Sequence, residues 1–545
     1  MRNAFRGKWL DLVAAAVVLH LVLIQPNHPA ATSLAVLFLF PLELPAILLG
    51  LVAIGNGMAG RTVRFALVGA LAAIATLKAA DYAMFTALGR SFNPVGDISL
   101  IAASFRLLSG TIGAAGAILA GAGAILTVAA VVALLWWATG VWARLSPPKL
   151  GRSFAAAGAV AAAFVAAAEI GDAMGRWTLP IQPPGAAFTT RVGVERVDMA
   201  RATIADLREF AAAAEIDPFA GTTGLLDAID RDVLIVFVES YGRTSIDTPF
   251  YAEAHVPTLE AAEARLSKIG LAMRSAYLSA PTRGGQSWLS HSTFASGLWV
   301  DDQTRYSAAL ASGRETLFQI AARSGFRTAA VMPAITLEWP EAKFMGFDTV
   351  LAAADLGYRG KPFNWVTMPD QFTLAALDRL LRREQDDRSL FAQVALISSH
   401  APWVPVPEIL DWERLGDGRV FDAAATSGDP PEVVWRDRDR VRAQYRLAID
   451  YALTTVFDYA ARHAETPPLM IIVGDHQAAG FIALDERSDV PIHVVGPAHL
   501  VQRIRGEGWS DGLIPEPDAA VVPMDRMRDM ILRSFSTGAK VVATG

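Results

Sequence analysis

The chain has 545 residues, more than one typical domain requires, and 53% of them are hydrophobic. A mean hydropathy of +0.33 is too apolar for an ordinary soluble protein, and a net charge of −6 gives no indication of nucleic-acid binding. The sequence has no cysteine, which excludes disulfides, thiolate metal ligands and cysteine nucleophiles.

The N-terminal third of the chain contains five apolar segments long enough to cross a bilayer, which takes roughly 20 residues each. They cover residues 9–25, 33–55, 63–88, 111–143 and 153–175. We interpret the first as a retained span rather than a signal peptide, because "LIQPNHPAA" is a poor cleavage site and four further spans follow. The sequence therefore predicts a transmembrane domain of five helices over residues 1–175.

Basic residues mark alternate loops between these segments. Arg61 and Arg64 lie between the second and third segments, and Arg144, Lys149 and Arg152 lie between the fourth and fifth. The link after the first segment has neither Lys nor Arg. Since positively charged loops stay in the cytoplasm, the N-terminus is predicted to be cytoplasmic and everything after about residue 176 to be extracytoplasmic.

Five ionisable residues fall inside the apolar segments or at their ends: Glu43, Lys78, Asp81, Glu169 and Asp172. Charged groups at membrane depth suggest a function, and they support an alternative hypothesis, a non-catalytic sensor or transporter subunit. The simpler interpretation is local pairing, for example of Lys78 with Asp81 three residues on, together with solvation at the membrane surface.

Residues 176–228 are predicted to form a juxtamembrane connector, with a Pro-rich part followed by a stretch of helical periodicity. From about residue 229 onward, strand-like and helix-like segments alternate. The strand candidates are 232–240, 327–333, 390–398, 469–475 and 489–496, and the helix candidates include 316–324, 370–383 and 441–462. This alternation predicts an α/β domain over residues 229–545, with a mostly parallel sheet flanked by helices.

Three strand candidates end in reactive side chains. "LIVFVES" leads to Glu239, "VALISSH" to His400, and "IIVGDHQAAG" to Asp475 and His476. The carboxyl ends of parallel strands meet at one edge of a sheet, where ligands bind in open α/β folds. Carboxylate and imidazole groups suit a divalent metal ion, so the pattern indicates either a metal site or ordinary polar strand ends.

A nucleophile candidate lies in "SAPTRGGQSWLSHSTFASGL", which reads as a glycine-containing loop that enters a helix near Ser287. Backbone N–H groups at a helix start favour an anion such as a phosphate. A serine bound there to a divalent metal can lose its proton near neutral pH without a histidine base. The alternatives are that Ser287 only caps the helix, or that Thr282 is the nucleophile.

Together these residues resemble the alkaline phosphatase superfamily, and most closely its membrane-bound, sulfatase-like branch. Glu239 in "VES", Ser287 in "GGQSWLS", His400 in "SSHAPW" and the pair Asp475–His476 occur in the order of that family. The branch includes lipoteichoic acid synthases, phosphoglycerol transferases of periplasmic glucans and lipid A phosphoethanolamine transferases. The resemblance implies a protein of the bacterial cytoplasmic (inner) membrane, with its catalytic domain on the periplasmic side.

The resemblance also implies a role for each of these residues. Glu239, Asp475 and His476 would hold one divalent metal ion (Mn, Zn or Mg), with the hydroxyl oxygen of Ser287 as a fourth ligand. Ser287 would be the nucleophile. His400 would contact the phosphoryl oxygens and protonate the leaving group.

Two further residues are candidates for binding the substrate. Arg283 can reach the phosphate, judged from its charge and its place in the loop. Lipoteichoic acid synthases carry a Trp and an Arg two residues apart for the polar headgroup. Here Trp339 is present, but Glu341 stands where the Arg would fall, and this departure leaves the headgroup open.

The resemblance implies a transferase that moves a phospholipid headgroup, phosphoglycerol or phosphoethanolamine, through a phospho-serine intermediate to a glycan or lipid acceptor of the envelope. A hydrolase of the same superfamily, a phosphodiesterase or phosphatase, would use water as the acceptor. A sulfatase is a further alternative, because "SAPTR" superficially matches the sulfatase motif, with Ser279 as its nucleophile and Pro281 and Arg283 in register.

Overall fold

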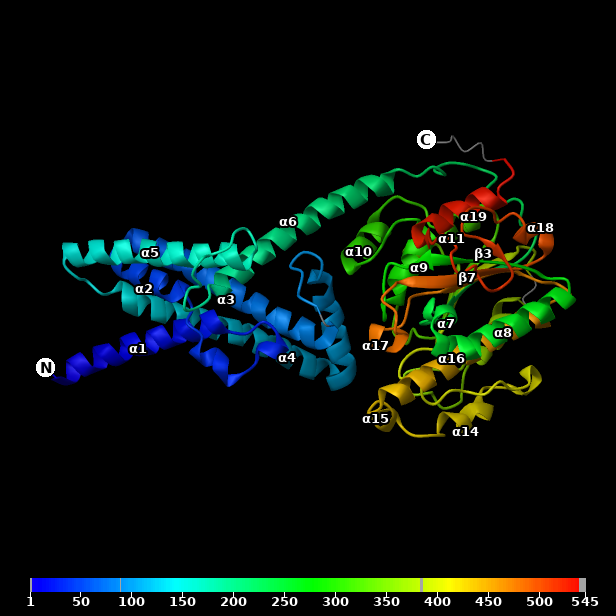
Figure 1. The fold of residues 1–545 in the computed structure, drawn as a ribbon, viewed down its shortest axis with the longest axis horizontal. Coiled ribbons are helices and arrows are strands. Elements are labelled where there is room, and N and C mark those ends of the chain that lie inside the picture. Colours follow the sequence, from blue (N-terminus) through cyan, green and yellow to red (C-terminus); the bar gives the residue numbers. More distant parts are fainter. Residues whose placement is uncertain (1, 89, 383–385, 539–545) are drawn as a thin grey trace. The chain divides into compact units, whose positions relative to one another are not determined.

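A computed structural model describes residues 2–88, 90–382 and 386–538, and the chain divides into two compact units, Met1–Asp206 and Leu207–Gly545 (Figure 1). The boundary between the units falls inside the predicted connector 176–228. The domain bounds 1–175, 176–228 and 229–545 stay a prediction.

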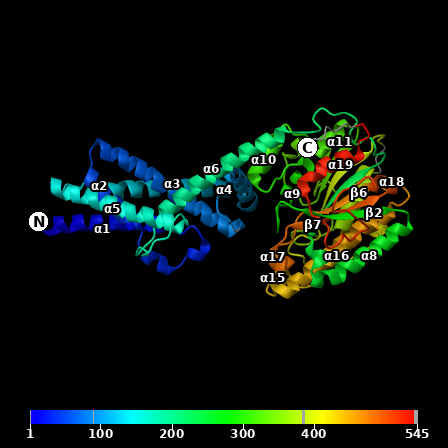
Figure 2. The same cartoon turned by 45° about the horizontal axis from the view of Figure 1, so that its top comes forward.

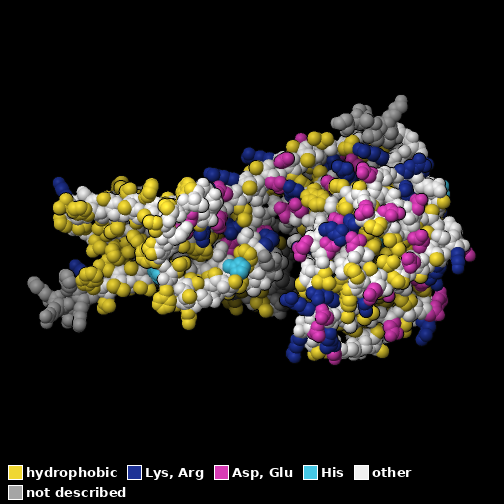
Figure 3. All heavy atoms as spheres, viewed as in Figure 1, with side chains coloured by type: hydrophobic (Ala, Val, Ile, Leu, Met, Phe, Trp, Pro, Cys, Tyr) yellow, Lys and Arg dark blue, Asp and Glu magenta, His cyan; other side chains and the backbone are white. Residues whose placement is uncertain are grey.

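The N-terminal unit is built from helices. They are α1 (Arg2–Ile24), η1 (Pro29–Ala31), η2 (Leu34–Phe38), α2 (Glu43–Ile54), α3 (Met58–Leu88), α4 (Ile98–Ala143), α5 (Lys149–Ala173) and α6 (Phe188–Glu215), which runs past the unit boundary. Hydrophobic side chains cover much of the face of this unit that Figure 3 shows, whereas charged side chains are spread over the C-terminal unit.

Among the described residues, three helical segments are long and apolar enough to cross a membrane: Met58–Thr86, Ile112–Ala143 and Lys149–Ala173. They correspond to the last three of the five predicted spans and indicate a membrane protein. The predicted count of five is not confirmed. The second predicted span is interrupted at Pro41, which lacks a backbone N–H, and α2 after it has 12 residues, a rise of about 18 Å against a bilayer core of about 30 Å.

The ionisable residues of the apolar segments are bound mainly by the first turns of α6 and the residue before it. Lys78 Nζ donates to Thr189 Oγ1 (2.6 Å) and to Leu23 O (3.0 Å). Further contacts are Asp81 with Arg196 (3.2 Å), Glu43 with the N–H of Thr190 (2.9 Å), and Glu169 with the N–H of Ala187 (2.9 Å). Lys78 and Asp81 thus have other partners than the mutual pair expected from their spacing, and these contacts favour a structural role.

The C-terminal unit contains a nine-stranded mixed sheet in the order β4-β3-β5-β1-β6-β7-β2-β8, with β9 paired to β2. The strands are β1 (Val233–Val238), β2 (Ala272–Ser279), β3 (Arg327–Met332), β4 (Thr349–Ala352), β5 (Leu390–Leu396), β6 (Leu469–Gly474), β7 (Asp489–Gly496), β8 (Ser510–Asp511) and β9 (Val522–Pro523). The five strands from β4 to β6 are parallel, and β7 is antiparallel to both of its neighbours. All five predicted strands are present, as β1, β3, β5, β6 and β7, and the structure adds β2, β4, β8 and β9.

Helices cover both faces of this sheet. Figure 2 shows α8 (Pro249–Lys268) and α16 (Arg438–Arg462) on one face, with α9 (Ser287–Ser296), α11 (Leu317–Arg323) and α19 (Met527–Phe535) on the other. Side chains alternate along β1, so Leu234, Val236 and Val238 belong to one core and Ile235 and Phe237 to the other. Burial on both faces explains why the central strands read as continuous apolar runs.

The remaining short elements connect the main helices and strands. They are α7 (Thr244–Asp247), α10 (Gln303–Ala311), α12 (Ala342–Met345), α13 (Asp370–Leu377), η3 (Asp378–Arg382), η4 (Trp412–Arg414), η5 (Arg419–Phe421), α14 (Asp422–Ala425), α15 (Pro431–Val434), α17 (Gly480–Ala483), α18 (Ala498–Val501) and η6 (Met524–Arg526). The helix candidates 316–324, 370–383 and 441–462 correspond to α11, to α13 with η3, and to α16.

Candidate active site

The order of the central strands brings the predicted residues to one edge of the sheet. β1 is paired with β6 in the register Val238↔Gly474 and with β5 in the register Val238↔Leu396. Glu239 and Asp475 therefore leave neighbouring strands side by side. Gly474 permits this approach, because a Cβ there would lie 1.9 Å from the carbonyl oxygen of Tyr241.

Glu239, Asp475 and His476 form a buried cluster in which each residue offers a ligand atom within 4.8 Å of the others. His476 Nε2 lies 3.1 Å from Glu239 Oε1 and 3.8 Å from Asp475 Oδ1. His476 Nδ1 lies 3.0 Å from the carbonyl oxygen of Gln477, which directs Nε2 toward the carboxylates. Two carboxylates and one imidazole fit a divalent cation, and this orientation is typical of a metal-ligating histidine.

The pKa values of the cluster reflect two buried carboxylates that share one imidazole. Burial and the nearby charge of Glu239 raise the pKa of Asp475 to about 7. Burial lowers the pKa of His476, but Asp475 and Glu239 outweigh this effect and raise it to about 9. Burial opposes ionisation of Glu239 as well, yet the charge of His476 and its hydrogen bond hold the pKa of Glu239 well below its usual range. Without a metal, the proton on His476 supplies the positive charge.

Ser287 is the first residue of α9, and its hydroxyl donates a hydrogen bond to Glu239 Oε2 (3.1 Å). It does not cap the helix, because Gln286 holds the N-cap position in a left-handed conformation (φ 65°). The preceding loop folds back on the residue after the metal pair, since Gly284 N donates to Gln477 O (2.7 Å). This turn places the hydroxyl of Ser287 beside the cluster.

The two competing nucleophiles are placed differently. Thr282 donates its hydroxyl to the carbonyl oxygen of Gly285 within the same loop (2.6 Å). Ser279 ends β2, opposite Asp489 of β7 and Pro523 of β9. β2 is three strands away from β1, which is about 14 Å at the usual strand spacing. Among the described residues, no hydrogen bond joins either hydroxyl to the cluster.

His400 is exposed four residues beyond β5, with Nδ1 directed at the carbonyl oxygen of Ala401. An electrostatic contribution from His400 lowers the pKa of Glu239, which reflects the proximity of His400 to the cluster. Asp370 fixes the start of this loop, because Asp370 Oδ1 accepts from the N–H groups of Ile397 (2.7 Å) and Ser398 (2.9 Å). Burial raises the pKa of Asp370 to about 6.

The two predicted substrate-binding residues have other partners in the structure. Arg283 makes an ion pair with Glu486 Oε2 (2.6 Å) and donates to Glu486 O (2.7 Å). Trp339 is half-buried in the loop after β3, where it packs against Phe347. No contact joins either side chain to the cluster among the interactions of the described residues, so both assignments stay predictions.

Several residues that support the cluster have no distinctive sequence signal. Ser240 adopts a left-handed conformation (φ 56°), and its N–H donates to Asp475 Oδ1 (2.8 Å). Its carbonyl oxygen accepts from the hydroxyl of Tyr445 (2.8 Å). Gln477 is fully buried, and both its side-chain amide atoms make no hydrogen bond with described residues.

Two other histidines near the site are structural. His291 packs on Phe237, with ring centroids 4.0 Å apart, and burial lowers its pKa to about 4. His493 lies between Ser275 Oγ (2.8 Å) and the hydroxyl of Tyr241 (3.1 Å).

Residues 231–486 match the family model described as Sulfatase, a range that contains Glu239, Ser287, His400, Asp475 and His476. This region is thus a sulfatase-like domain of the alkaline phosphatase superfamily, and the chain is an enzyme of that class. Both predictions are confirmed. Among curated proteins, none is similar enough in sequence to match.

Three solved structures illustrate what the chain is similar to. The lipoteichoic acid synthase LtaP from Listeria monocytogenes is 12% identical, with 62% of this chain and 79% of that chain covered and a TM-score of 0.40. The phosphoglycerol transferase GacH from Streptococcus pyogenes is also 12% identical, with 61% of this chain and 82% of that chain covered and a TM-score of 0.38. The soluble domain of lipooligosaccharide phosphoethanolamine transferase A from Neisseria meningitidis is 14% identical, with 58% of this chain and 89% of that chain covered and a TM-score of 0.36. These likenesses are distant, and the family match identifies the domain.

Proposed function

We propose that the protein is a metal-dependent membrane phosphotransferase. It moves a phospholipid headgroup, phosphoglycerol or phosphoethanolamine, through a phospho-serine intermediate at Ser287 to a glycan or lipid acceptor of the bacterial envelope. The observation that carries the proposal is the hydrogen bond from Ser287 Oγ to Glu239 Oε2 (3.1 Å), which sets a hydroxyl at a helix start beside the buried cluster. The three apolar helices support a lipid donor, because they keep the enzyme at a membrane.

Each residue of the site has a role in this proposal. Glu239, Asp475 and His476 hold one divalent ion (Mn, Zn or Mg), with Ser287 Oγ as a fourth ligand. When bound, such an ion lowers the pKa of the serine hydroxyl and offsets the charge of the attacked phosphate. The N–H groups at the start of α9 favour the phosphoryl group, since they carry partial positive charge.

The transfer takes place in two displacements. In the first, Ser287 Oγ, having lost its proton to solvent, forms a bond to phosphorus, and the bond from phosphorus to the diacylglycerol oxygen breaks. His400 gives that oxygen a proton. In the second, His400 takes the proton of the acceptor hydroxyl, whose oxygen bonds to phosphorus as the bond to Ser287 breaks. With Nδ1 directed at Ala401 O, Nε2 is the nitrogen of His400 that serves this exchange.

A phosphodiesterase or phosphatase differs from this scheme only in using water as the acceptor. The exposure of His400 favours it as the second candidate, because water reaches the group that activates the acceptor. A sulfatase reaction at Ser279 is less compatible with the position of that residue between β7 and β9.

Intact-mass analysis tests the proposal. The detergent-solubilised chain, incubated with a labelled phospholipid donor and no acceptor, should gain one headgroup phosphate on Ser287 and release diacylglycerol. Ser287→Ala should abolish the adduct and lower turnover by about 10⁴-fold or more, as loss of a nucleophile does. Ser279→Ala and Thr282→Ala are matched controls, because each also removes one hydroxyl group, and both variants should still form the adduct on Ser287. An adduct on Ser279, or full turnover by Ser287→Ala, would refute the assignment.

A further inference from the structure

Exposed aromatic side chains gather at the edge of the sheet that holds the candidate site. Six aromatic residues are exposed among the described residues of the C-terminal unit, and five of them lie in loops or helix starts at the carboxyl ends of strands. They are Phe250 at the start of α8, Trp288 beside Ser287, Trp365 before α13, Trp435 before α16 and Phe481 in α17. The sixth, Phe344, lies in the crossover between β3 and β4. Such a one-sided distribution indicates an interaction surface.

Four of these residues belong to segments that carry candidate site residues or contact the segment after His400, and Leu484 extends the set. We call Trp288, Trp365, Trp435, Phe481 and Leu484 the apolar rim; their exposed fractions are 43, 82, 43, 43 and 52%. Trp288 is the neighbour of the nucleophile candidate. Trp365 belongs to the loop whose Asn364 side chain donates to the carbonyl oxygen of Val404, four residues after His400 in the chain. Phe481 and Leu484 follow the metal pair in the chain.

Part of the apolar rim is held rigidly although it is exposed. The indole of Trp435 lies parallel to that of the buried Trp403, with centroids 5.7 Å apart and an angle of 4° between the rings. Its Nε1 donates to Pro402 O (3.2 Å), and the ring of Phe481 meets it edge-on at 6.3 Å. Apolar side chains fixed in an exposed position lose little conformational entropy when they bind a partner.

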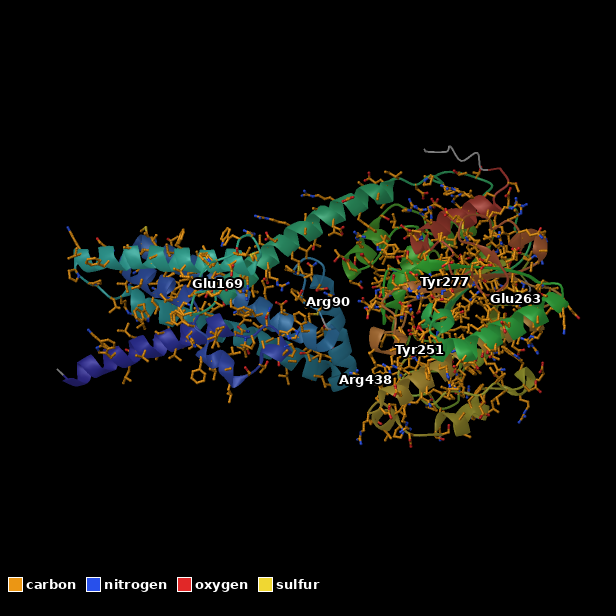
Figure 4. All side chains as sticks on the ribbon, viewed as in Figure 1. Arg90, Glu169, Tyr251, Glu263, Tyr277 and Arg438 are labelled. Atoms are coloured by element: carbon orange, nitrogen blue, oxygen red, sulfur yellow. The ribbon has the colours of Figure 1, made fainter. Side chains whose placement is uncertain are left out.

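The segment beside Trp435 is basic. Residues 435–446 contain five arginines and two aspartates. Arg436 and Arg438 are exposed, and their side chains make no hydrogen bond or ion pair with described residues. Arg438 lies at the start of α16, at the periphery of the unit (Figure 4). Indole rings with neighbouring arginines are typical of surfaces that meet the headgroups of anionic lipids.

We propose that the apolar rim and Arg436 and Arg438 dock the C-terminal unit on a bilayer that contains anionic phospholipid. The purpose of the docking, to bring the site to a lipid donor, rests on the proposed function. The contact with the bilayer itself requires no catalysis. A bilayer suits the rim better than a sugar chain, because Phe481 and Leu484 offer no hydrogen bonds to hydroxyl groups. The apolar helices of the same chain keep a bilayer within reach.

A single fluorescent label can test the docking, because the chain contains no cysteine of its own. Leu484→Cys, labelled with an environment-sensitive fluorophore in the full chain, is reconstituted in nanodiscs of phosphatidylcholine and phosphatidylglycerol that contain headgroup-proximal spin-labelled lipid. We expect a blue-shifted emission that the spin label quenches. Ile269→Cys is the matched control: it is also apolar, 40% exposed, and ends α8 at the opposite edge of the sheet, so it should not be quenched.

A charge variant tests the part played by the arginines. Arg436→Gln combined with Arg438→Gln should weaken docking in the anionic nanodiscs by about fivefold per arginine, and added salt should have the same direction of effect. In nanodiscs of phosphatidylcholine alone, the variant should behave like the parent.

Several outcomes would overturn the docking. They are an unquenched label at position 484, equal quenching at 484 and 269, or shielding of the label by a soluble envelope glycan instead of lipid. The experiment is done in the Ser287→Ala background, so a failure of the proposed chemistry leaves the quenching intact. Conversely, if the parent chain with Ser287 forms the adduct from a soluble short-chain donor while the label at position 484 stays unquenched, docking alone is refuted.

Discussion

Raising the pH from about 7 to about 9.5 is expected to destabilise the C-terminal unit when no divalent metal is bound. Burial lowers the pKa of His476, but Asp475 and Glu239 raise it from 6.5 to about 9. A group with a raised pKa stabilises the fold fully below its unfolded pKa, and this stabilisation is lost as the pH rises through the folded value. The interval from 6.5 to about 9 corresponds to about 3 kcal/mol.

Thermal melting of the detergent-solubilised chain, followed by tryptophan fluorescence, measures this loss. For a unit of the size of Leu207–Gly545, about 3 kcal/mol corresponds to a decrease in Tm of about 4 °C. His476→Gln is the control, because it removes the titrating group and with it this part of the pH dependence. Saturating metal should also reduce the decrease, since the ion replaces the proton on His476. An unchanged Tm of the metal-free protein, or an equal decrease in His476→Gln, would refute the reasoning.

Three further predictions concern the metal, the His400 loop and the topology. Asp475→Asn and His476→Ala should each lower the metal content of the purified chain in elemental analysis, because each loses a proposed ligand; unchanged stoichiometry in both would contradict the site. Asp370→Ala removes the acceptor of two buried backbone N–H groups, so it should lower the free energy of unfolding by about 2–4 kcal/mol and also lower kcat. Asp370→Asn keeps an oxygen at this position and should retain most of the stability and most of kcat. Equal losses in the two variants would contradict a positioning role. Reporter fusions at residues 150 and 300 should report opposite compartments, and equal signals would overturn the predicted orientation.

The sequence predicted the central strands well because a strand buried on both faces must be apolar at every position. Residues 233–238 and 469–474 satisfy this condition, and residues 390–396 do so except at the buried Gln393. It did not predict β2, where the partly buried Arg274 and the buried Ser275 interrupt the apolar run. It also counted 33–55 as one span from its composition, although Pro41 cannot donate the hydrogen bond that a continuous helix needs there.

The site was predictable as a set of residue types and only partly as a set of contacts. Residues with distinctive chemistry at strand ends, such as Glu239 and the pair Asp475–His476, point to a metal site from the sequence. Ser240 and Gln477 have ordinary side chains, and their importance arises from a left-handed backbone and from complete burial. Neither property can be read from residue identity.

The sequence by itself thus determined which chemical groups are available and which segments can enter a sheet or a membrane. Only the tertiary structure decided which groups meet. Glu239 lies beside Asp475 because β1 and β6 are neighbours in the sheet. The two strand ends are far apart in the chain: Ser240, the residue after Glu239, precedes Asp475 by 235 positions. Ser287 reaches Glu239 because its loop turns back onto Gln477. Strand order and loop direction follow from how all the helices and strands pack together, and a local pattern of side chains does not contain that information.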